Sequence, residues 1–125
     1  MKFSIFLSLV CMSLLPGCVR SEAQEAIYHK VSPDEAYRMM SELKDYVILD
    51  VRTDAEYREK RIAGAILIPD YEIKDRAEKE LPDQNKLILV YCRSGRRSAN
   101  VASILVEMGY TNVYDFGGIN DWSYN

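Results

Sequence analysis

One cysteine of the 125-residue chain stands in a setting that favours a reactive sulfur. It follows an apolar run and opens a loop of small and basic residues: Cys92, Arg93, Ser94, Gly95, Arg96, Arg97 and Ser98. A tight turn that leads into a helix points several backbone N–H groups into one concavity, and the helix dipole adds about half a positive charge there. Helix N-termini and neighbouring arginines favour the thiolate form of a cysteine. The loop therefore predicts a nucleophilic Cys92 that needs no separate base at neutral pH.

The three arginines of this loop indicate that it binds an anion. A guanidinium group suits an oxyanion because its planar fork can donate to two oxygens at once. We expect Arg93 and Arg97 to contact the anion ahead of Arg96, and at least one of the three to face solvent or pair with an acid. The interpretation as an inert cysteine before a basic helix start is weaker, because cations at a helix N-terminus oppose the dipole. Residues 93–98 are therefore the predicted substrate-binding segment.

Other cysteine chemistries fit the chain less well. Cysteine-dependent phosphatases resemble one another in Cys-x5-Arg, but Ser98 stands at the arginine position here and Arg97 comes one residue early. The shorter bowl favours attack on sulfur over attack on phosphorus. An arsenate-type reductase would need a second cysteine in the mature domain. A Cys–His protease dyad would need His29, the single histidine, to fold back beside Cys92, and no local signal supports that.

The elements around the loop are those of an α/β domain. Apolar or alternating runs predict five strands, at residues 27–31, 46–50, 65–68, 87–91 and 113–116. Between them, apolar spacing and cap residues predict four helices, at residues 33–43, 54–58, 71–81 and 96–108. Strands that alternate with helices form a mainly parallel sheet, and such sheets bind ligands beyond the carboxyl ends of their strands. Cys92 lies at such an end.

The caps of these helices can be read from single residues. Ser32 and Glu35 have the spacing of a capping box, with proline at the first helical position, and Thr53 and Glu56 repeat that spacing. Gly109 is the expected C-terminal cap of the helix that follows the cysteine loop.

The first segment of the chain is not part of the predicted domain. A basic start and an apolar run from Phe3 to Leu15, too short to span a bilayer, describe a secretory signal over residues 1–17. Leu15-Pro16-Gly17-Cys18 resembles the lipobox of bacterial lipoproteins, which would make Cys18 the lipidated first mature residue. Cleavage near Ala23 and a buried hydrophobic helix are the alternatives. Residues 18–26 are then a linker and residues 27–125 the domain.

This reading predicts an extracytoplasmic protein of a bacterial cell, either periplasmic or held at a membrane surface by a lipid on Cys18. Removing the signal takes away Lys2 and Cys11, so the formal net charge falls from −3 to −4. A chain of that charge is not expected to bind nucleic acid in general. With Cys18 acylated, Cys92 is the one free thiol left, which predicts chemistry without a resolving partner.

Several segments, in order, resemble the rhodanese family, specifically its single-domain sulfurtransferases. They are residues 47–52 (Val-Ile-Leu-Asp-Val-Arg), Glu56-Tyr57, residues 62–65 (Ile-Ala-Gly-Ala), the Cys92 loop, and Phe116-Gly117-Gly118 with Trp122. The resemblance extends from about Ile27 to Trp122. Arg61 departs from the family, which often has histidine there, at a position that is structural.

The resemblance implies a five-stranded, mainly parallel sheet flanked by helices on both faces. It also implies sulfur transfer by double displacement, in which Cys92 takes sulfur from thiosulfate or a similar donor and passes it from a persulfide to a thiol or cyanide. Asp50 and Arg52 match the family's structural pair that supports the loop. No metal, no cofactor and a monomeric state are expected. A non-catalytic persulfide carrier that delivers sulfur to a partner protein requires the same loop and remains the alternative.

Overall fold

The computed structural model describes residues 27–124. The predicted signal segment, Cys18 and the linker lie outside these residues, as does Asn125. The strands are β1 (His29–Lys30), β2 (Tyr46–Asp50), β3 (Ile66–Leu67), β4 (Leu87–Cys92) and β5 (Val113–Gly118). The α-helices are α1 (Pro33–Glu42), α2 (Asp54–Glu59), α3 (Ile73–Glu80) and α4 (Arg96–Glu107). Two short 3-10 turns, η1 (Asp70–Glu72) and η2 (Ile119–Asp121), complete the chain.

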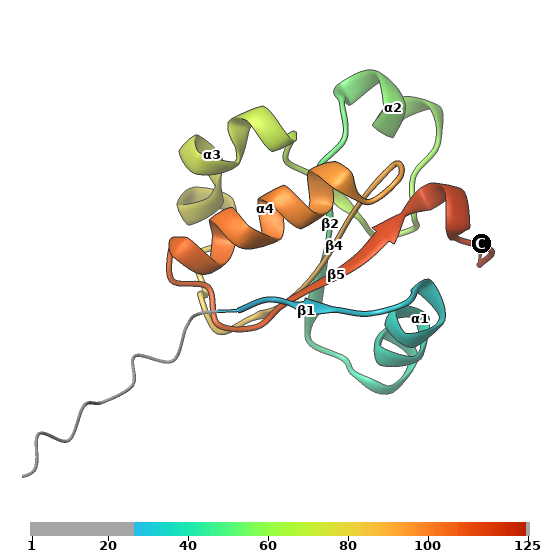
Figure 1. The fold of residues 1–125 in the computed structure, drawn as a ribbon, viewed down its shortest axis with the longest axis horizontal. Coiled ribbons are helices and arrows are strands. Elements are labelled where there is room, and N and C mark those ends of the chain that lie inside the picture. Colours follow the sequence, from blue (N-terminus) through green and yellow to red (C-terminus); the bar gives the residue numbers. More distant parts are fainter. Residues whose placement is uncertain (1–26, 125) are drawn as a thin grey trace, which may run out of the picture.

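The five strands form one sheet in the order β1-β5-β4-β2-β3, and every pair is parallel. This confirms the predicted fold class. Helices α3 and α4 cover one face of the sheet and α1 covers the other (Figure 1). The crossover from β2 leads to β3 on one side, and the crossover from β4 leads to β5 on the other side. The carboxyl ends of β2 and β4 therefore flank a topological switch point, where sheets of this kind bind ligands.

Two layers of apolar side chains pack against the sheet, one on each face. One packs Ile73 and Ala77 of α3 and Val101 and Leu105 of α4 against the strands. The other packs Ala36 of α1 and a cluster of aromatic rings near the C-terminus against the opposite face. All six residues of β4 are buried, as expected for a central parallel strand with covered faces. Cys92 is thus the last residue of the most enclosed strand.

The structure corrects three local expectations. The edge strands β1 and β3 are two residues long, and the helix expected at residues 71–81 begins at Ile73, because the chain first makes the 3-10 turn after Pro69. Ser32 caps α1 as predicted, but Glu35 does not complete a capping box because its carboxylate accepts from Arg38. Within residues 27–124, no helix is long and apolar enough to cross a membrane.

Candidate active site

The sulfur of Cys92 is enclosed at the carboxyl end of β4. The residue is 1% exposed, and its Sγ accepts a hydrogen bond from the backbone N–H of Gly95 at 3.0 Å. Its Sγ also lies 3.5 Å from the hydroxyl oxygen of Ser98. Both partners come from the predicted loop, so the chain closes back on its own cysteine within six residues. Cys92 is the free cysteine of the described residues.

Gly95 makes this closure possible because it adopts a φ of +108°, a conformation that residues with a side chain rarely adopt. It is also the N-cap of α4, so the helix begins directly after the turn. The first backbone N–H groups of a helix have no partner within it, and α4 carries no acidic residue in its first turn. The loop therefore presents unpaired amides and a positive helix end beside the sulfur, which is a favourable place for an anion.

A second glycine lets the loop lie against β5. Cys92 is opposite Gly118 in the sheet, after an irregularity in the pairing of β4 with β5. A β-carbon at Gly118 would lie 2.0 Å from the carbonyl oxygen of Arg93, so only glycine fits there without movement. The same carbonyl accepts from the backbone N–H of Asn120 at 3.3 Å. The peptide after Cys92 is thus fixed by the end of β5.

Ser98 connects the loop to the same end of β5. Its hydroxyl lies 3.1 Å from the carbonyl oxygen of Gly95 and 3.2 Å from that of Gly117. The backbone N–H of Gly117 in turn donates to the buried carboxylate of Asp115 at 3.0 Å. Ser98 is completely buried. It therefore contacts the loop and the sulfur from within the protein.

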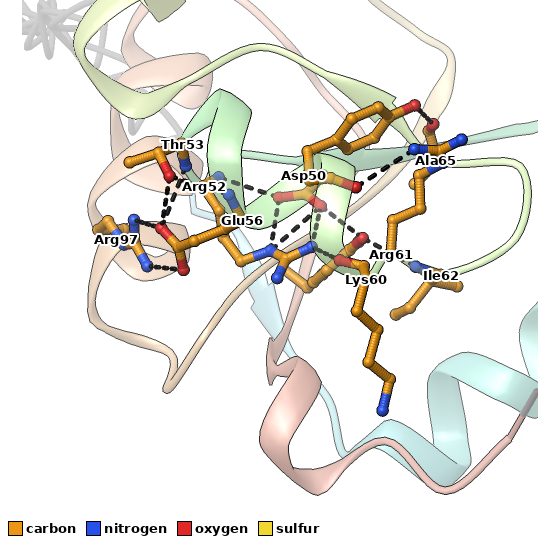
Figure 2. A network of polar contacts seen from close by, with 11 residues as sticks. Asp50, Arg52, Thr53, Glu56, Lys60, Arg61, Ile62, Ala65 and Arg97 are labelled. Atoms are coloured by element: carbon orange, nitrogen blue, oxygen red, sulfur yellow. Dashed lines mark hydrogen bonds and ion pairs between the residues drawn. The ribbon is translucent and has the colours of Figure 1, made fainter.

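Arg97 is held by an acid from another helix (Figure 2). Its two terminal nitrogens donate to the two oxygens of Glu56 at 2.7 and 3.0 Å, and both side chains are largely buried. Thr53 and Glu56 also complete the predicted capping box at the start of α2. The hydrogen bonds from Arg97, and next those from Thr53, outweigh burial and lower the pKa of Glu56 to about 2. The ion pair connects α2 to the first turn of α4.

The Glu56 pair bears on two expectations from the sequence. The Glu56 carboxylate supplies the anion that a cation at a helix N-terminus requires. The same carboxylate accepts from both terminal nitrogens of Arg97, which are the atoms that would otherwise bind a substrate anion. The hydrogen bonds with Glu56 raise the pKa of Arg97, with smaller contributions from the charges of Glu56 and Cys92. Glu56 was not predicted as a site residue, although its place in the capping box and in the family motif was visible.

Asp50 and Arg52 form a buried ion pair at the end of β2, as Figure 2 shows. The Arg52 Nε and Nη2 atoms donate to the Asp50 carboxylate at 3.0 and 2.7 Å, and Nη2 also donates to the carbonyl of Lys60. Burial alone would lower the pKa of Arg52, but the hydrogen bonds and charge of Asp50 outweigh it and raise the pKa. Among the described residues, no hydrogen bond or ion pair joins either side chain to Cys92, and their role toward the loop stays a prediction.

Tyr91, next to the cysteine, completes this network. Its hydroxyl donates to Asp50 Oδ2 at 2.7 Å and accepts from the backbone N–H of Ile62 at 3.1 Å. Burial, and then the hydrogen bond to Asp50, raise the pKa of the Tyr91 hydroxyl, so it stays protonated. The residue is completely buried and reaches across from β4 to the segment before β3. The sequence predicted Tyr91 only as part of a strand.

Arg93 and Arg96 are exposed and line different hollows. Arg93 lines a hollow of about 270 Å³ with Lys60 and Asn120. Arg96 lines a separate hollow of about 700 Å³ together with Ser94 and Gly95. Of the predicted loop residues, Gly95 and Ser98 thus contact the sulfur, and the roles of all of them toward a substrate stay predictions.

His29 lies apart from this site. It is an exposed residue of the edge strand β1, two strands away from β4, and its ring stacks on Tyr114 with 4.6 Å between centroids. The geometry gives no support to a Cys–His dyad. Among residues 27–124, no three histidine, cysteine, aspartate or glutamate side chains gather in a metal-binding arrangement.

Known proteins resemble this chain in sequence and in fold. The thiosulfate sulfurtransferase PspE of Escherichia coli is 44% identical over 73 residues, which are 58% of this chain and 70% of that protein. The thiosulfate sulfurtransferase GlpE of Coxiella burnetii is 37% identical over 97 residues, 77% of this chain and 88% of that protein. A solved rhodanese-related protein of Thermoplasma volcanium superposes with a TM-score of 0.67 at 29% identity, over 78% of this chain and 96% of that one. A family model, the rhodanese-like domain, matches residues 32–125, and the chain belongs to that family.

Proposed function

We propose that the chain is a sulfurtransferase that moves sulfane sulfur from thiosulfate, or a similar donor, to a thiophilic acceptor through a persulfide on Cys92. Membership of the rhodanese-like family and the two relatives named thiosulfate sulfurtransferase support a rhodanese-type enzyme. The observation that carries the finer proposal is the position of Cys92 Sγ, 3.0 Å from the amide of Gly95 at the start of α4.

In the first half of the reaction, the Cys92 thiolate attacks the outer sulfur of thiosulfate. A bond forms between the two sulfurs, the S–S bond of thiosulfate breaks, and its electron pair leaves with sulfite. The amides at the start of α4 stabilise the negative charge that moves onto the bound outer sulfur. In the second half, the acceptor attacks this outer sulfur and the electron pair of the broken bond returns to Cys92.

Arg97 and Arg93 have different surroundings, and we propose different roles for them. Because Arg97 is bound on both terminal nitrogens by Glu56, we assign it to the shape and charge of the loop. Arg93 is exposed and lines the hollow beside the switch point between β2 and β4. We therefore propose Arg93 and the loop amides as the first contacts of the donor's sulfonate oxygens.

A steady-state assay of thiosulfate with cyanide tests the proposal. We expect saturable formation of thiocyanate that disappears in Cys92→Ser. Turnover that survives this substitution would refute the mechanism. A carrier that receives its sulfur from a partner protein would instead show no turnover with thiosulfate, although a preformed persulfide on Cys92 would release its one sulfur to cyanide. Hydrolysis of a small aryl phosphate faster than sulfur transfer would move the protein to the phosphatase class.

We further propose that the protein is exported and anchored by a lipid on Cys18. The support is the sequence pattern of residues 1–18, which lie outside the described residues. Mass spectrometry of the protein purified from a bacterial membrane fraction should find Cys18 as an acylated first residue. A Cys18→Ala variant should lose this acylation and leave the membrane fraction. An unmodified mature N-terminus near Ala23 would refute the anchor.

A further inference from the structure

Two hollows of different size flank the cysteine loop. The smaller, of about 270 Å³, lies on the Arg93 side. The larger, of about 700 Å³, is lined by three parts of the chain. They are the end of β1 with the start of α1, loop residues 94–96, and the end of β5 with Asp121. We name the larger one the Lys30–Arg96 groove. Its volume is in the range of sites that enclose small organic ligands, whereas thiosulfate has only five heavy atoms.

The Lys30–Arg96 groove adjoins the backbone that contacts the reactive sulfur. Gly95, whose N–H contacts Cys92 Sγ, forms part of its wall. Gly117, whose carbonyl lies 3.2 Å from the Ser98 hydroxyl, forms another part. A molecule seated in the groove would therefore lie against the backbone that holds the sulfur, on the side away from Arg93.

The charge of the groove favours an anion. Lys30 and Arg96 are both exposed on its rim, and among the described residues neither makes an ion pair. Asp121 is the one carboxylate among the described residues that line it. The smaller hollow also carries two exposed cations that make no ion pair among the described residues, Lys60 and Arg93, so its smaller volume is what distinguishes it from the Lys30–Arg96 groove.

We propose that the Lys30–Arg96 groove binds the sulfur acceptor and that the acceptor is a small thiol bearing carboxylates. The inference rests on the proposed sulfur transfer and specifies its second substrate. Lys30, Arg96 and the size of the groove select a ligand that is larger than the donor and carries negative charge beside its thiol. Lys30 becomes a specificity-determining residue that lies in β1, remote in sequence from the loop.

The transfer needs no further reagent. The thiolate of the acceptor attacks the outer sulfur of the Cys92 persulfide, and a new S–S bond forms on the acceptor. The bond between the outer sulfur and Cys92 Sγ breaks, and its electron pair restores the Cys92 thiolate. The product is the persulfide of the acceptor, so electrons and atoms balance without an oxidant.

A pair of acceptors that differ in charge tests the inference. The protein is assayed with thiosulfate and either mercaptosuccinate, which carries two carboxylates, or neutral 2-mercaptoethanol. For each protein variant, the measured quantity is kcat/KM for mercaptosuccinate divided by kcat/KM for 2-mercaptoethanol. The intrinsic reactivity of the two thiols contributes equally to this ratio in every variant and so cancels when variants are compared. In Lys30→Gln we expect this ratio to fall about threefold to fivefold, the effect of one exposed charge contact.

The Asp121→Asn variant should move the ratio in the opposite direction, because it removes the opposing charge from the groove. The matched control is Lys44→Gln, an exposed lysine just before β2 at the amino end of the sheet, and its ratio should equal that of the parent. A merely structural effect of either groove variant would change both acceptors alike and leave the ratio unchanged.

Three results separate the failure of this inference from the failure of the proposed function. If the parent transfers sulfur to cyanide but Lys30→Gln and Asp121→Asn leave the acceptor ratio unchanged, the groove does not bind the acceptor and the inference is wrong. A rise in the thiosulfate KM of Lys30→Gln at an unchanged acceptor ratio would place the donor in the groove and also overturn it. A parent that transfers no sulfur at all would refute the proposed function beneath the inference.

Discussion

Replacing Gly118 with alanine should displace the loop that follows Cys92. The backbone of Gly118 has a φ of −128°, which alanine adopts without strain, so the perturbation is purely one of space. The new β-carbon would lie 2.0 Å from the Arg93 carbonyl oxygen and 2.7 Å from the Ser94 nitrogen. Real β-carbons essentially never approach another heavy atom closer than 3.0 Å.

The loop must therefore move by about 1 Å, the difference between these distances. A misplacement of about 1 Å in a catalytic group can cost about 100-fold in rate, or about 2.7 kcal/mol of transition-state stabilisation. We expect kcat/KM for thiosulfate and cyanide to fall by about this factor in Gly118→Ala. Circular dichroism should show the fold retained, because the contact lies at the end of β5 and outside the apolar layers.

Gly64→Ala is the matched control. Gly64 has a φ of +82°, and a β-carbon there would meet nothing within 4 Å. This variant should lose about 1–3 kcal/mol of stability through backbone strain and keep its turnover. If Gly118→Ala retains kcat/KM within threefold of the parent, the close packing of the loop on β5 is not what positions the sulfur, and the reasoning fails.

Three further predictions concern the groups around the loop. Since the folded state holds the pKa of Glu56 at about 2, below its ordinary 4.5, the ion pair should add stability that is present above about pH 4.5 and is lost as the pH falls toward 2. Urea unfolding of the parent and Glu56→Gln should differ by about 1–3 kcal/mol at pH 7 and converge at the acid end; a constant difference would argue against the pair. Tyr91→Phe should destabilise the domain by about 2–3 kcal/mol in the same measurement, because it leaves the buried N–H of Ile62 without its acceptor and removes a hydrogen bond to Asp50; a loss under 0.5 kcal/mol would contradict this. Arg97→Lys should lower kcat more than it raises the thiosulfate KM if Arg97 shapes the loop, whereas a selective rise in KM would return it to donor binding.

The sequence predicted the sheet well because its strands carry strong local signals. Residues 46–50 and 87–91 are short apolar runs of the kind buried in parallel sheets, and both became central strands. The edge strands β1 and β3 were overestimated, because pairing on one side supports only a short ladder there. The start of the helix after Pro69 was misplaced because a 3-10 turn and a helix carry the same local pattern.

The candidate site was predicted in composition but not in geometry. Spacing alone placed Cys92 at a strand end before a helix, and the structure closes the loop with Gly95 as the N-cap. The partner of Arg97 could not be derived in this way, because Glu56 lies 41 residues earlier and meets it only through the fold. The same holds for Gly118, whose lack of a side chain matters only once β5 lies beside the loop.

The most direct test of the account is the mass of the peptide that contains Cys92 after brief exposure of the protein to thiosulfate. We predict that this peptide gains the mass of one sulfur atom, that one sulfite is released for each sulfur bound, and that cyanide removes the added sulfur as thiocyanate. Cys92→Ser should gain none. An unchanged Cys92 peptide during sustained turnover, or sulfur found on another residue, would contradict the persulfide mechanism.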